Sequence, residues 1–590
     1  MKKLIKNYLF IFKELRKSSR LLPFFLLLTT TVTGLASIIT KYILKIIVTK
    51  LGKEILWSNF LFLVFAYTFI LVFSNVINNY QNYLSNIANR RFSYNMQTKL
   101  MEKIRTTRYD AFFSPEFQNL YTTVQQSVQT ESSSLVFVSV LIIRLLVRLV
   151  SNYIVLAQTS LNLSIILTIC IIPSLIIQLH IKKAQLKVVE SRMLNVRKIN
   201  YSFMVSTEKA YVNEFRLFNL HKLFLAIREK EFAKHIKSWV DFGRKEFIAN
   251  VFSCILPCIG VFISILWMIA QVQCKRYSIA DFIFYSSIVF TLQGLLQSLV
   301  SDISQSYKSI IFFNKFFEFL EFNCEIKSGT KNIQKDLKKH VLEFRNVYFS
   351  YPYSKKLALK DVSFIIGTNE MVAFVGQNGC GKTSIVNLML RIYTPTSGTI
   401  LLDGIDINEY EYEEYLQFFS AIFQDYQKYS VKIRNYIMPI EEVKTDNYLK
   451  IEQAIRDTTA TEIVKKTPYG IESELTTRFN KEGIGLSGGQ WQKLVIARTL
   501  CSDAHILIFD EATSAIDRMA ENEICNNLIS RCKNKISIFI SHRIYITKYV
   551  HKIIYMEEGK IKDIGSHEEL IRRNEGYKKL FYGRANKQNS

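Results

Sequence analysis

The fold of the second half of the chain is decided by one stretch, Met371-Val-Ala-Phe-Val-Gly376-Gln377-Asn378-Gly379-Cys380-Gly381-Lys382-Thr383-Ser384. A short apolar run precedes a glycine-rich loop, and residues 385–391 continue with helical spacing, which predicts strand, loop and helix. The loop matches G-x-x-x-x-G-K-[ST], in which glycines let backbone N–H groups and a helix N-terminus face an anion. We expect Lys382 to bring charge to the β- and γ-phosphates of a nucleotide and Thr383 to offer its hydroxyl to Mg²⁺.

A second strand is expected at residues 506–511, where four apolar residues end in Asp510 and Glu511. Such a strand presents both carboxylates at its C-terminal end, where α/β folds place ligands. We expect Asp510 to support the Mg²⁺ shell and Glu511 to polarise the attacking water as a general base. The alternative is an acidic strand end that caps a helix.

A third glycine-rich segment, Leu486-Ser487-Gly488-Gly489-Gln490, precedes a helical run at residues 491–500. Ser487 and the glycines are suited to bind phosphate at a second helix N-terminus. This segment and the glycine-rich loop of the same chain do not readily contact one and the same γ-phosphate. A dimer with nucleotide between two copies resolves the difficulty, although the spacing alone does not prove it.

Composition separates the two halves of the 590-residue chain, whose net charge is +26 and whose hydrophobic content is 49%. Residues 1–340 hold 43 Lys and Arg against 19 Asp and Glu, whereas residues 341–590 hold 33 against 31. An apolar-poor basic tail protein is excluded, and nucleic-acid binding is not expected. A membrane protein with basic cytoplasmic segments fits both numbers.

The first half contains six apolar stretches, each long enough for a hydrocarbon core of about 30 Å. They are roughly Leu21–Val48, Leu56–Val76, Ser134–Ala157, Leu161–His180, Phe247–Val272 and Ile279–Val300. The long segments 78–133 and 181–246 are too polar to face lipid but keep helical spacing, so we expect membrane helices that continue into water and turn back. These segments and the N-terminus are basic, which predicts a cytoplasmic location for them and for the C-terminal domain. The alternative is six buried helices of a soluble protein.

The predicted organisation is a six-helix transmembrane domain with two long cytoplasmic loops at 1–326, a polar linker at 327–340, a nucleotide-binding domain at 341–582 and a tail at 583–590. The predicted fold class is an α-helical six-span membrane domain followed by an α/β P-loop ATPase domain.

Five ordered motifs resemble those of ABC ATPases: Gly376–Ser384 (Walker A), Leu486–Gln490 (signature), Ile506–Glu511 (Walker B), Ser514-Ala-Ile-Asp517 (D-loop) and Ser541-His542-Arg543 (H-loop). With six spans before them, the chain resembles an exporter half-transporter, an integral protein of the bacterial plasma membrane that uses ATP and Mg²⁺. The resemblance implies that Tyr351 stacks on adenine and that Gln424 senses Mg²⁺. It further implies that His542 contacts the γ-phosphate and orients Glu511, and that Asp517 crosses a dimer interface.

Lantibiotic and bacteriocin exporters are similar in Phe423–Tyr429 and in Trp491 after the signature. This likeness implies export of a peptide cargo by two copies in membrane lipid. The alternatives are a multidrug or lipid exporter, one half of a heterodimer, or a non-transporting, ligand-sensing membrane ATPase. Tyr109–Phe117 and Glu214–Asn219 resemble coupling helices that contact the ATPase in such exporters, and the alternative is ordinary cytoplasmic helix surface.

Two arginines, Arg144 and Arg148, lie four residues apart in the third apolar stretch. Charge inside a span is costly and usually faces a cavity or a partner. We expect both residues to line an inward-facing cavity and to favour anionic or carboxylate-bearing cargo. The alternatives are a salt bridge to Asp281 or Asp302, or contact with lipid phosphate.

Overall fold

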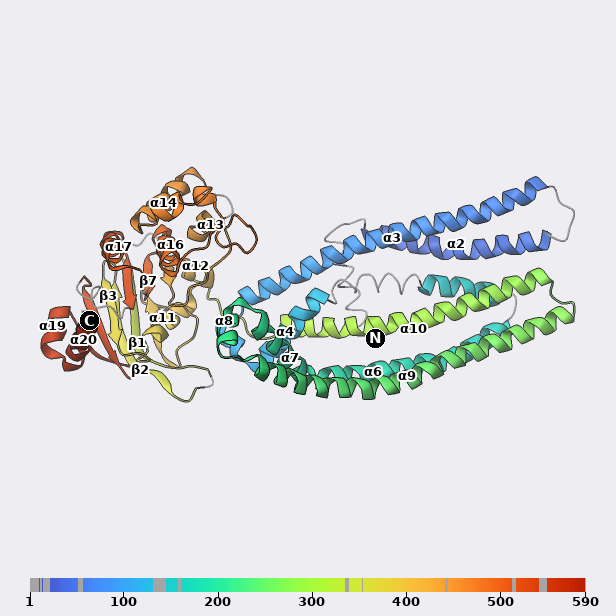
Figure 1. Ribbon diagram of the computed structural model, residues 1–590, viewed down its shortest axis with the longest axis horizontal. Helices are drawn as coiled ribbons and strands as arrows, with labels where there is room; N and C mark the ends of the chain where they lie inside the picture. Colours follow the sequence, from blue (N-terminus) through green and yellow to red (C-terminus); the bar gives the residue numbers. More distant parts are fainter. Residues whose placement is uncertain are drawn as a thin grey trace. The chain divides into compact units, whose positions relative to one another are not determined.

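The computed structural model of the chain describes residues 10, 13, 22–50, 57–130, 145–157, 161–334, 339–352, 354–440, 444–511, 516–540 and 549–588. Contacts within the chain divide it into two units (Figure 1). Unit 1 comprises Met1–Arg105 and Asn119–Phe322, and unit 2 comprises Thr106–Gln118 and Asn323–Ser590.

Long helices form the described part of unit 1. They are α2 (Leu22–Lys50), α3 (Trp57–Arg105), α4 (Pro115–Thr130, which begins in unit 2), a helix at Leu145–Ala157, α6 (Leu161–Ser191), α7 (Met193–Thr207), α8 (Lys209–Leu217), α9 (His221–Gln273) and α10 (Ile279–Glu321).

Four helical stretches are long and apolar enough to cross a membrane, namely Leu28–Lys50, Trp57–Arg105, Leu163–Gln185 and His221–Gln273. Two shorter apolar helices lie at Leu145–Ala157 and Ile279–Leu295. All of these overlap the apolar stretches of the sequence, and the count of six spans stays a prediction.

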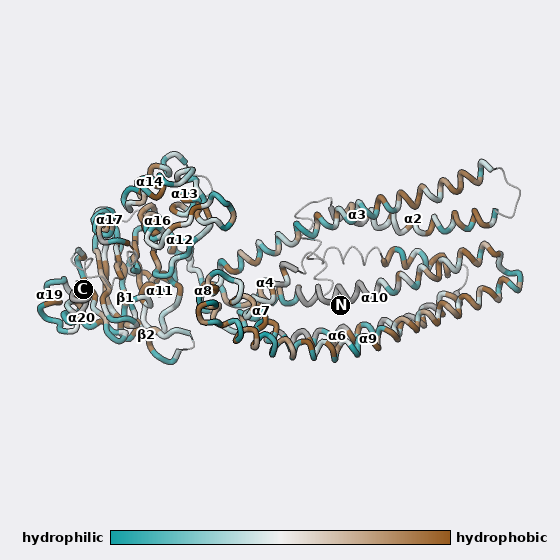
Figure 2. Tube along the Cα trace, in the orientation of Figure 1, coloured by the Kyte–Doolittle hydropathy of each residue, from teal (hydrophilic) through white to brown (hydrophobic). Residues whose placement is uncertain are grey.

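The helices continue beyond their apolar parts, as the sequence predicts. Helix α3 has 49 residues and α9 has 53, so each is roughly 75 Å long at 1.5 Å per residue, well over twice the hydrocarbon thickness. Figure 2 shows apolar residues concentrated in the part of α3 nearest Trp57 and in the part of α9 nearest Gln273. Large apolar side chains are exposed there, including Phe62, Phe65 and Phe262, which is expected where the surrounding solvent is lipid.

Unit 2 contains two sheets. A four-stranded antiparallel sheet has the order β2-β1-β4-β5, and a six-stranded sheet has the order β10-β9-β3-β8-β7-β6. The strands are β1 (Val341–Ser350), β2 (Leu357–Gly367), β3 (Met371–Gly376), β4 (Ser397–Leu402), β5 (Ile405–Asp406), β6 (Phe419–Ile422), β7 (Ile506–Asp510), β8 (Ile536–Ile540), β9 (Lys552–Glu557) and β10 (Lys560–Gly565).

Helices surround these sheets in unit 2. They are η1 (Tyr109–Phe113), α11 (Lys382–Met389), η2 (Ile407–Glu409), α12 (Tyr412–Gln417), α13 (Ile433–Ile437), α14 (Thr445–Asp457), α15 (Thr461–Lys465), η3 (Gly470–Glu472), α16 (Gly488–Cys501), α17 (Arg518–Arg531), α19 (His567–Arg573) and α20 (Glu575–Gln588).

The central strands of the larger sheet explain the continuous apolar runs in the sequence. Every residue of β7 and β8 is buried, and so is every residue of β3 after Met371. Strands β3, β8, β7 and β6 are parallel, and parallel strands covered on both faces need apolar side chains on both faces. Their C-terminal ends therefore meet at one edge, where Gly376, Asp510 and Ile540 lie.

The polar segment before β1 is bound to unit 2 rather than free of it. The Gly329 N–H donates to the Tyr410 carbonyl oxygen at 3.0 Å, and the Lys331 N–H donates to the Glu409 carbonyl oxygen at 3.0 Å. The Arg391 guanidinium, which lies just after α11, donates to the Lys327 carbonyl oxygen at 2.7 Å. These bonds join residues 327–331 to Glu409 and Tyr410 and to Arg391, two residues beyond the end of α11.

The short segment Thr106–Gln118 also belongs to unit 2. The Arg108 N–H donates to the Cys324 carbonyl oxygen at 2.7 Å, and the Tyr109 ring lies 5.7 Å from the Tyr393 ring. This segment is the first of the two predicted coupling helices. The second, Glu214–Asn219, overlaps the end of α8 in unit 1, and α8 has no buried side chain.

Candidate functional site

The glycine-rich loop connects β3 to α11, as the sequence predicts. Gly381 immediately precedes α11 and has a φ of +106°, in the region that residues with a Cβ avoid. A Cβ at this position would lie 2.6 Å from Leu359 Cδ2. Both facts explain why the loop needs glycine at this position.

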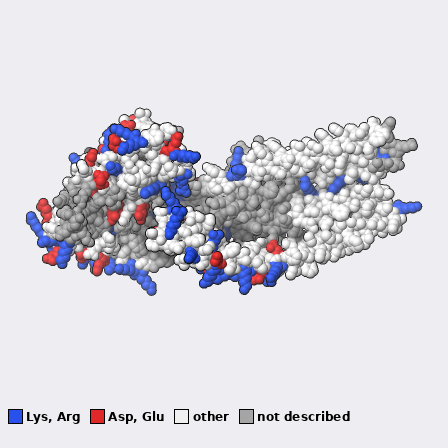
Figure 3. All heavy atoms as spheres, viewed as in Figure 1, with Lys and Arg blue, Asp and Glu red and all other residues white. Residues whose placement is uncertain are grey.

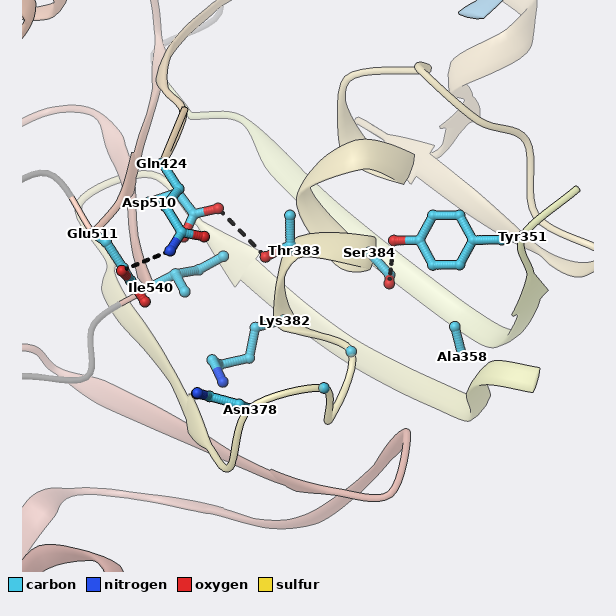
Figure 4. Close-up of a pocket in the computed structure, with 12 residues that line it drawn as sticks. Tyr351, Ala358, Asn378, Lys382, Thr383, Ser384, Gln424, Asp510, Glu511 and Ile540 are labelled. Atoms are coloured by element: carbon cyan, nitrogen blue, oxygen red, sulfur yellow. Dashed lines mark hydrogen bonds between the residues drawn. The ribbon is translucent and has the colours of Figure 1, made fainter. Parts of the chain in front are cut away.

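A cavity of about 350 Å³ opens at this loop (Figure 4). It is lined by Tyr351, Ala358, Asn378, Gly379, Gly381, Lys382, Thr383, Ser384, Gln424, Asp510, Glu511 and Ile540. The Lys382 ammonium donates to the carbonyl oxygens of Gly376 at 3.1 Å and Gln377 at 2.9 Å. These bonds hold a positive charge at the loop that is built to surround phosphate.

Asp510, at the end of β7, is 2% exposed. Thr383 Oγ1 lies 3.5 Å from one of its carboxylate oxygens. Burial, and next the negative charge of Glu511, raise the pKa of Asp510 to about 6. A buried carboxylate that is costly to ionise favours a bound cation. The Thr383 hydroxyl, the Gln424 amide oxygen and the Asp510 carboxylate are the hard oxygen donors that Mg²⁺ prefers, so the residues present fit this ion.

Glu511 follows Asp510 and lines the same cavity. Its φ is +50°, an uncommon conformation for a residue other than glycine. The Glu511 N–H donates to the Ile540 carbonyl oxygen at 2.9 Å, and Gln424 Nε2 donates to the Glu511 carboxylate at 3.1 Å. The backbone therefore turns the carboxylate into the cavity, where Figure 4 shows it beside Gln424.

Tyr351 forms the wall of the cavity opposite the carboxylates (Figure 4). Its hydroxyl shares a hydrogen bond of 2.8 Å with Ser384 Oγ. Its ring packs edge-on against Phe349 at 4.9 Å and Tyr393 at 5.3 Å. An aromatic wall on one side and a phosphate loop on the other suit a nucleotide.

The remaining predicted nucleotide contacts lie elsewhere in unit 2. Ser487 caps α16, and its hydroxyl accepts the Gln490 N–H at 3.3 Å while the Gln490 side chain accepts the Ser487 N–H at 2.9 Å. Asp517 caps α17 by accepting the Ala520 N–H at 3.1 Å. Among the described residues, Ser487–Gln490 and Asp517 are not part of the lining of this cavity.

Four other residues that the sequence analysis names are considered singly. His542 and Arg144 lie outside the described residues. Cys380 is 4% exposed, with its sulfur 3.6 Å from the Lys382 ammonium. Asp281, considered above as a partner for the arginines, binds Lys45 at 2.7 Å.

Two residues of the cavity were missed in the sequence. Ala358 and Ile540 line it. Ile540 ends an apolar run that becomes a central parallel strand, and this position was a usable signal. Ala358 lies in β2, of the other sheet, and no local pattern links it to the glycine-rich loop.

A parallel α/β domain with a phosphate loop, a buried aspartate and an adjacent glutamate in one cavity defines a P-loop ATPase. Residues 359–514 match the ABC transporter family. A solved structure of a bacterial Atm1-family ABC exporter with ATP bound covers 95% of this chain and 97% of that chain, with a TM-score of 0.82 and 19% identity, which shows a shared fold.

Known transport proteins are similar to this chain in sequence. The subtilin transport ATP-binding protein of Bacillus subtilis is 28% identical over 98% of this chain and 95% of its own length. The nisin transport ATP-binding protein of Lactococcus lactis subsp. lactis is 26% identical over 88% and 87%. The ATP-dependent lipid A-core flippase of Haemophilus ducreyi is 34% identical over 53% of this chain and 52% of its own length.

The chain is therefore an ABC exporter of the half-transporter type, an integral membrane protein in which a helical membrane domain precedes an ABC ATPase domain. It binds ATP, and its hydrolysis of ATP is coupled to transport. The predicted family, the order of the two domains and the ATPase activity are confirmed.

Proposed function

We propose that this exporter moves a lantibiotic- or bacteriocin-like peptide out of the cytoplasm across the bacterial plasma membrane. The observation that carries the proposal is the extent of the similarity. Alignments with the subtilin and nisin transport proteins extend over 98% and 88% of the chain, so they include its membrane half. The alignment with the lipid A-core flippase extends over 53%.

In the proposed ATPase cycle, Lys382 and the loop N–H groups hold the β- and γ-phosphates, and the Tyr351 ring packs against adenine. Thr383, Gln424 and Asp510 hold Mg²⁺, which when bound offsets phosphate charge. Glu511 accepts a proton from the attacking water. His542 contacts the γ-phosphate and orients Glu511.

The working form is proposed to be a homodimer in membrane lipid, in which each copy brings Ser487–Gln490 to the nucleotide of the other and Asp517 lies between them. The position of Ser487–Gln490 outside the lining of the cavity supports this arrangement. ATP closes two ATPase domains and turns the cargo cavity outward, and hydrolysis resets it. We further propose six spans, with the N-terminus and the ATPase domain in the cytoplasm.

Coupling is assigned to the Tyr109–Phe113 segment. Tyr109 and Tyr351 both pack on the Tyr393 ring, at 5.7 and 5.3 Å. The adenine side of the site is thereby in packing contact with a segment that continues into α4. A shift of the Tyr351 ring on nucleotide binding would displace the Tyr393 ring and, through it, Tyr109, because closely packed side chains transmit displacement.

The test uses the full chain in liposomes with its ATPase domain outside. Labelled subtilin or nisin precursor peptide is expected to accumulate in the lumen with ATP and not with the Glu511→Gln variant, which binds ATP but lacks the general base. Stimulated hydrolysis without accumulation of peptide would instead support a sensing ATPase. Accumulation of a labelled lipid and not of peptide would support a lipid exporter.

A further inference from the structure

Within unit 1, helix α2 lies closely against the helix Leu145–Ala157. A Cβ added to Gly34 would lie 2.7 Å from Val147 Cγ1, so this contact requires glycine. Lys41 lies seven residues, or about two turns, further along α2 and therefore on the same face. The ammonium of Lys41 is thus directed into the seam between the two helices.

In this seam the Lys41 ammonium donates to Asn152 Oδ1 at 2.7 Å. The amide nitrogen of Asn152 in turn donates to the Arg148 carbonyl oxygen at 2.7 Å. Asn152 is 1% exposed, and because both ends of its carboxamide are bonded, its oxygen is fixed toward Lys41. A neutral carboxamide oxygen accepts one of the three ammonium protons and offsets no charge.

The next lysine along α2 shows the contrast. Lys45 binds the Asp281 carboxylate at 2.7 Å, whereas Lys41 has no carboxylate partner among the residues that the structure describes. The Arg148 guanidinium acts on Lys41 as a like charge. The seam therefore brings two positive charges together, and part of the Lys41 side chain remains exposed.

Lys41 lies within the stretch of α2 that is long and apolar enough to cross a membrane. It lies nine residues, about 14 Å of helix, before Lys50 at the end of α2, and four residues before Lys45, whose partner Asp281 is in the first turn of α10. A charge in such a stretch is costly and marks a functional site. Figure 3 shows that Lys and Arg are sparse over the apolar part of unit 1.

We infer that Lys41 binds a carboxylate of the exported peptide, either an acidic side chain or the C-terminus. Asn152 holds the ammonium in place, Arg148 adds positive potential, and the carboxylate accepts the ammonium protons that Asn152 leaves free. The position of the ammonium between two closely packed helices, rather than at a helix end, favours this ligand over a lipid phosphate. The inference rests on the proposed peptide export and names the chemical group of the cargo that is recognised.

The test uses the full chain in liposomes and two labelled linear peptides. One carries Asp, Glu and a free C-terminus, and its twin carries Asn, Gln and a C-terminal amide. The acidic peptide is expected to reach half-maximal uptake at a concentration at least about tenfold lower than its twin does. This ratio of the two concentrations is the effect that a hydrogen bond between charged groups provides. Lys41→Gln, which keeps a donor for Asn152, is expected to bring this ratio to about one.

Two further variants guard the interpretation. Lys50→Gln removes the same charge from the exposed end of α2 and should leave the ratio and the basal ATPase activity unchanged. Asn152→Asp gives Lys41 a carboxylate of its own and should lower the ratio without removing the lysine. The site is supported if the difference between the acidic peptide and its twin is lost in Lys41→Gln and is also reduced in Asn152→Asp.

Other outcomes overturn it. The carboxylate site is contradicted if the natural chain takes up the two peptides equally, or if the Lys41→Gln variant keeps the same ratio. Neither result contradicts peptide export. The same liposomes are prepared with phosphatidylcholine alone and with phosphatidylglycerol. A lipid dependence that Lys41→Gln abolishes, with equal peptide uptake, would assign Lys41 to lipid phosphate. If neither peptide is taken up by an active ATPase, peptide export fails and the site fails with it.

Discussion

Replacement of Asp510 by asparagine is expected to stabilise the nucleotide-free protein while it abolishes ATP hydrolysis. Asp510 is 2% exposed, and burial together with Glu511 raises its pKa from an ordinary 3.8 to about 6. Above pH 6 the carboxylate is ionised in both the folded and the unfolded chain. The difference of about two pKa units then costs the folded state roughly 3 kcal/mol, which an uncharged carboxamide of the same shape avoids.

The sign of this effect sets its pH range. Because the pKa of Asp510 is higher in the folded chain, the folded state binds the proton more tightly than the unfolded state does. The contribution of Asp510 to the free energy of unfolding therefore decreases as pH rises from about 4 to about 6 and is lowest above that range. The advantage of Asp510→Asn is largest at pH 7.5 and falls to about 1 kcal/mol at pH 4.5.

The measurement is thermal unfolding of the detergent-solubilised full chain with EDTA and without nucleotide, followed by tryptophan fluorescence. Trp57, Trp239 and Trp267 are replaced by Phe in both proteins, which leaves Trp491 as the one Trp of the chain. For an ATPase domain of this size, roughly 3 kcal/mol corresponds to an increase in Tm of about 6 to 12 °C at pH 7.5. An equal or lower Tm for Asp510→Asn at pH 7.5, or an advantage that does not shrink at pH 4.5, would refute the reasoning.

Three further substitutions test the site and its surroundings. Gly381→Ala imposes a φ of +106° on alanine and places its Cβ 2.6 Å from Leu359. The affinity for a fluorescent ATP analogue should therefore fall at least about tenfold. The control is Gly367→Ala, where a Cβ meets nothing within 4 Å, and it should bind the analogue as the natural chain does. Tyr415→Phe removes a fully buried hydroxyl that donates to a main-chain carbonyl at 2.6 Å, and the unpaired acceptor should cost about 1–3 kcal/mol, visible as a lower Tm. Tyr393→Leu keeps an apolar side chain but loses the ring contacts to the coupling segment, so basal ATP hydrolysis should persist while its stimulation by cargo peptide is lost; stimulation equal to that of the natural chain would remove this route.

The sequence alone determined the features that arise from local pattern. The run of apolar residues before Gly376 and the apolar run that ends at Asp510 predicted strands, because parallel strands covered on both faces need continuous apolar side chains. The glycine-rich loop was readable because only glycine fits the backbone at Gly381. The long helices of unit 1 followed from length and helical spacing. All of these constraints act over a few residues, so a linear sequence displays them.

Only the tertiary structure decided which distant residues meet. Lys41 and Asn152 are separated by 111 positions, and nothing in either apolar stretch marks them as a pair. The same holds for Tyr109 and Tyr393, which bring a segment between two membrane helices into unit 2. Side-chain period reports the face on which a residue lies but not the element that covers it. Close packing between elements supplied that information, and both the coupling contact and the inferred carboxylate site depend on it.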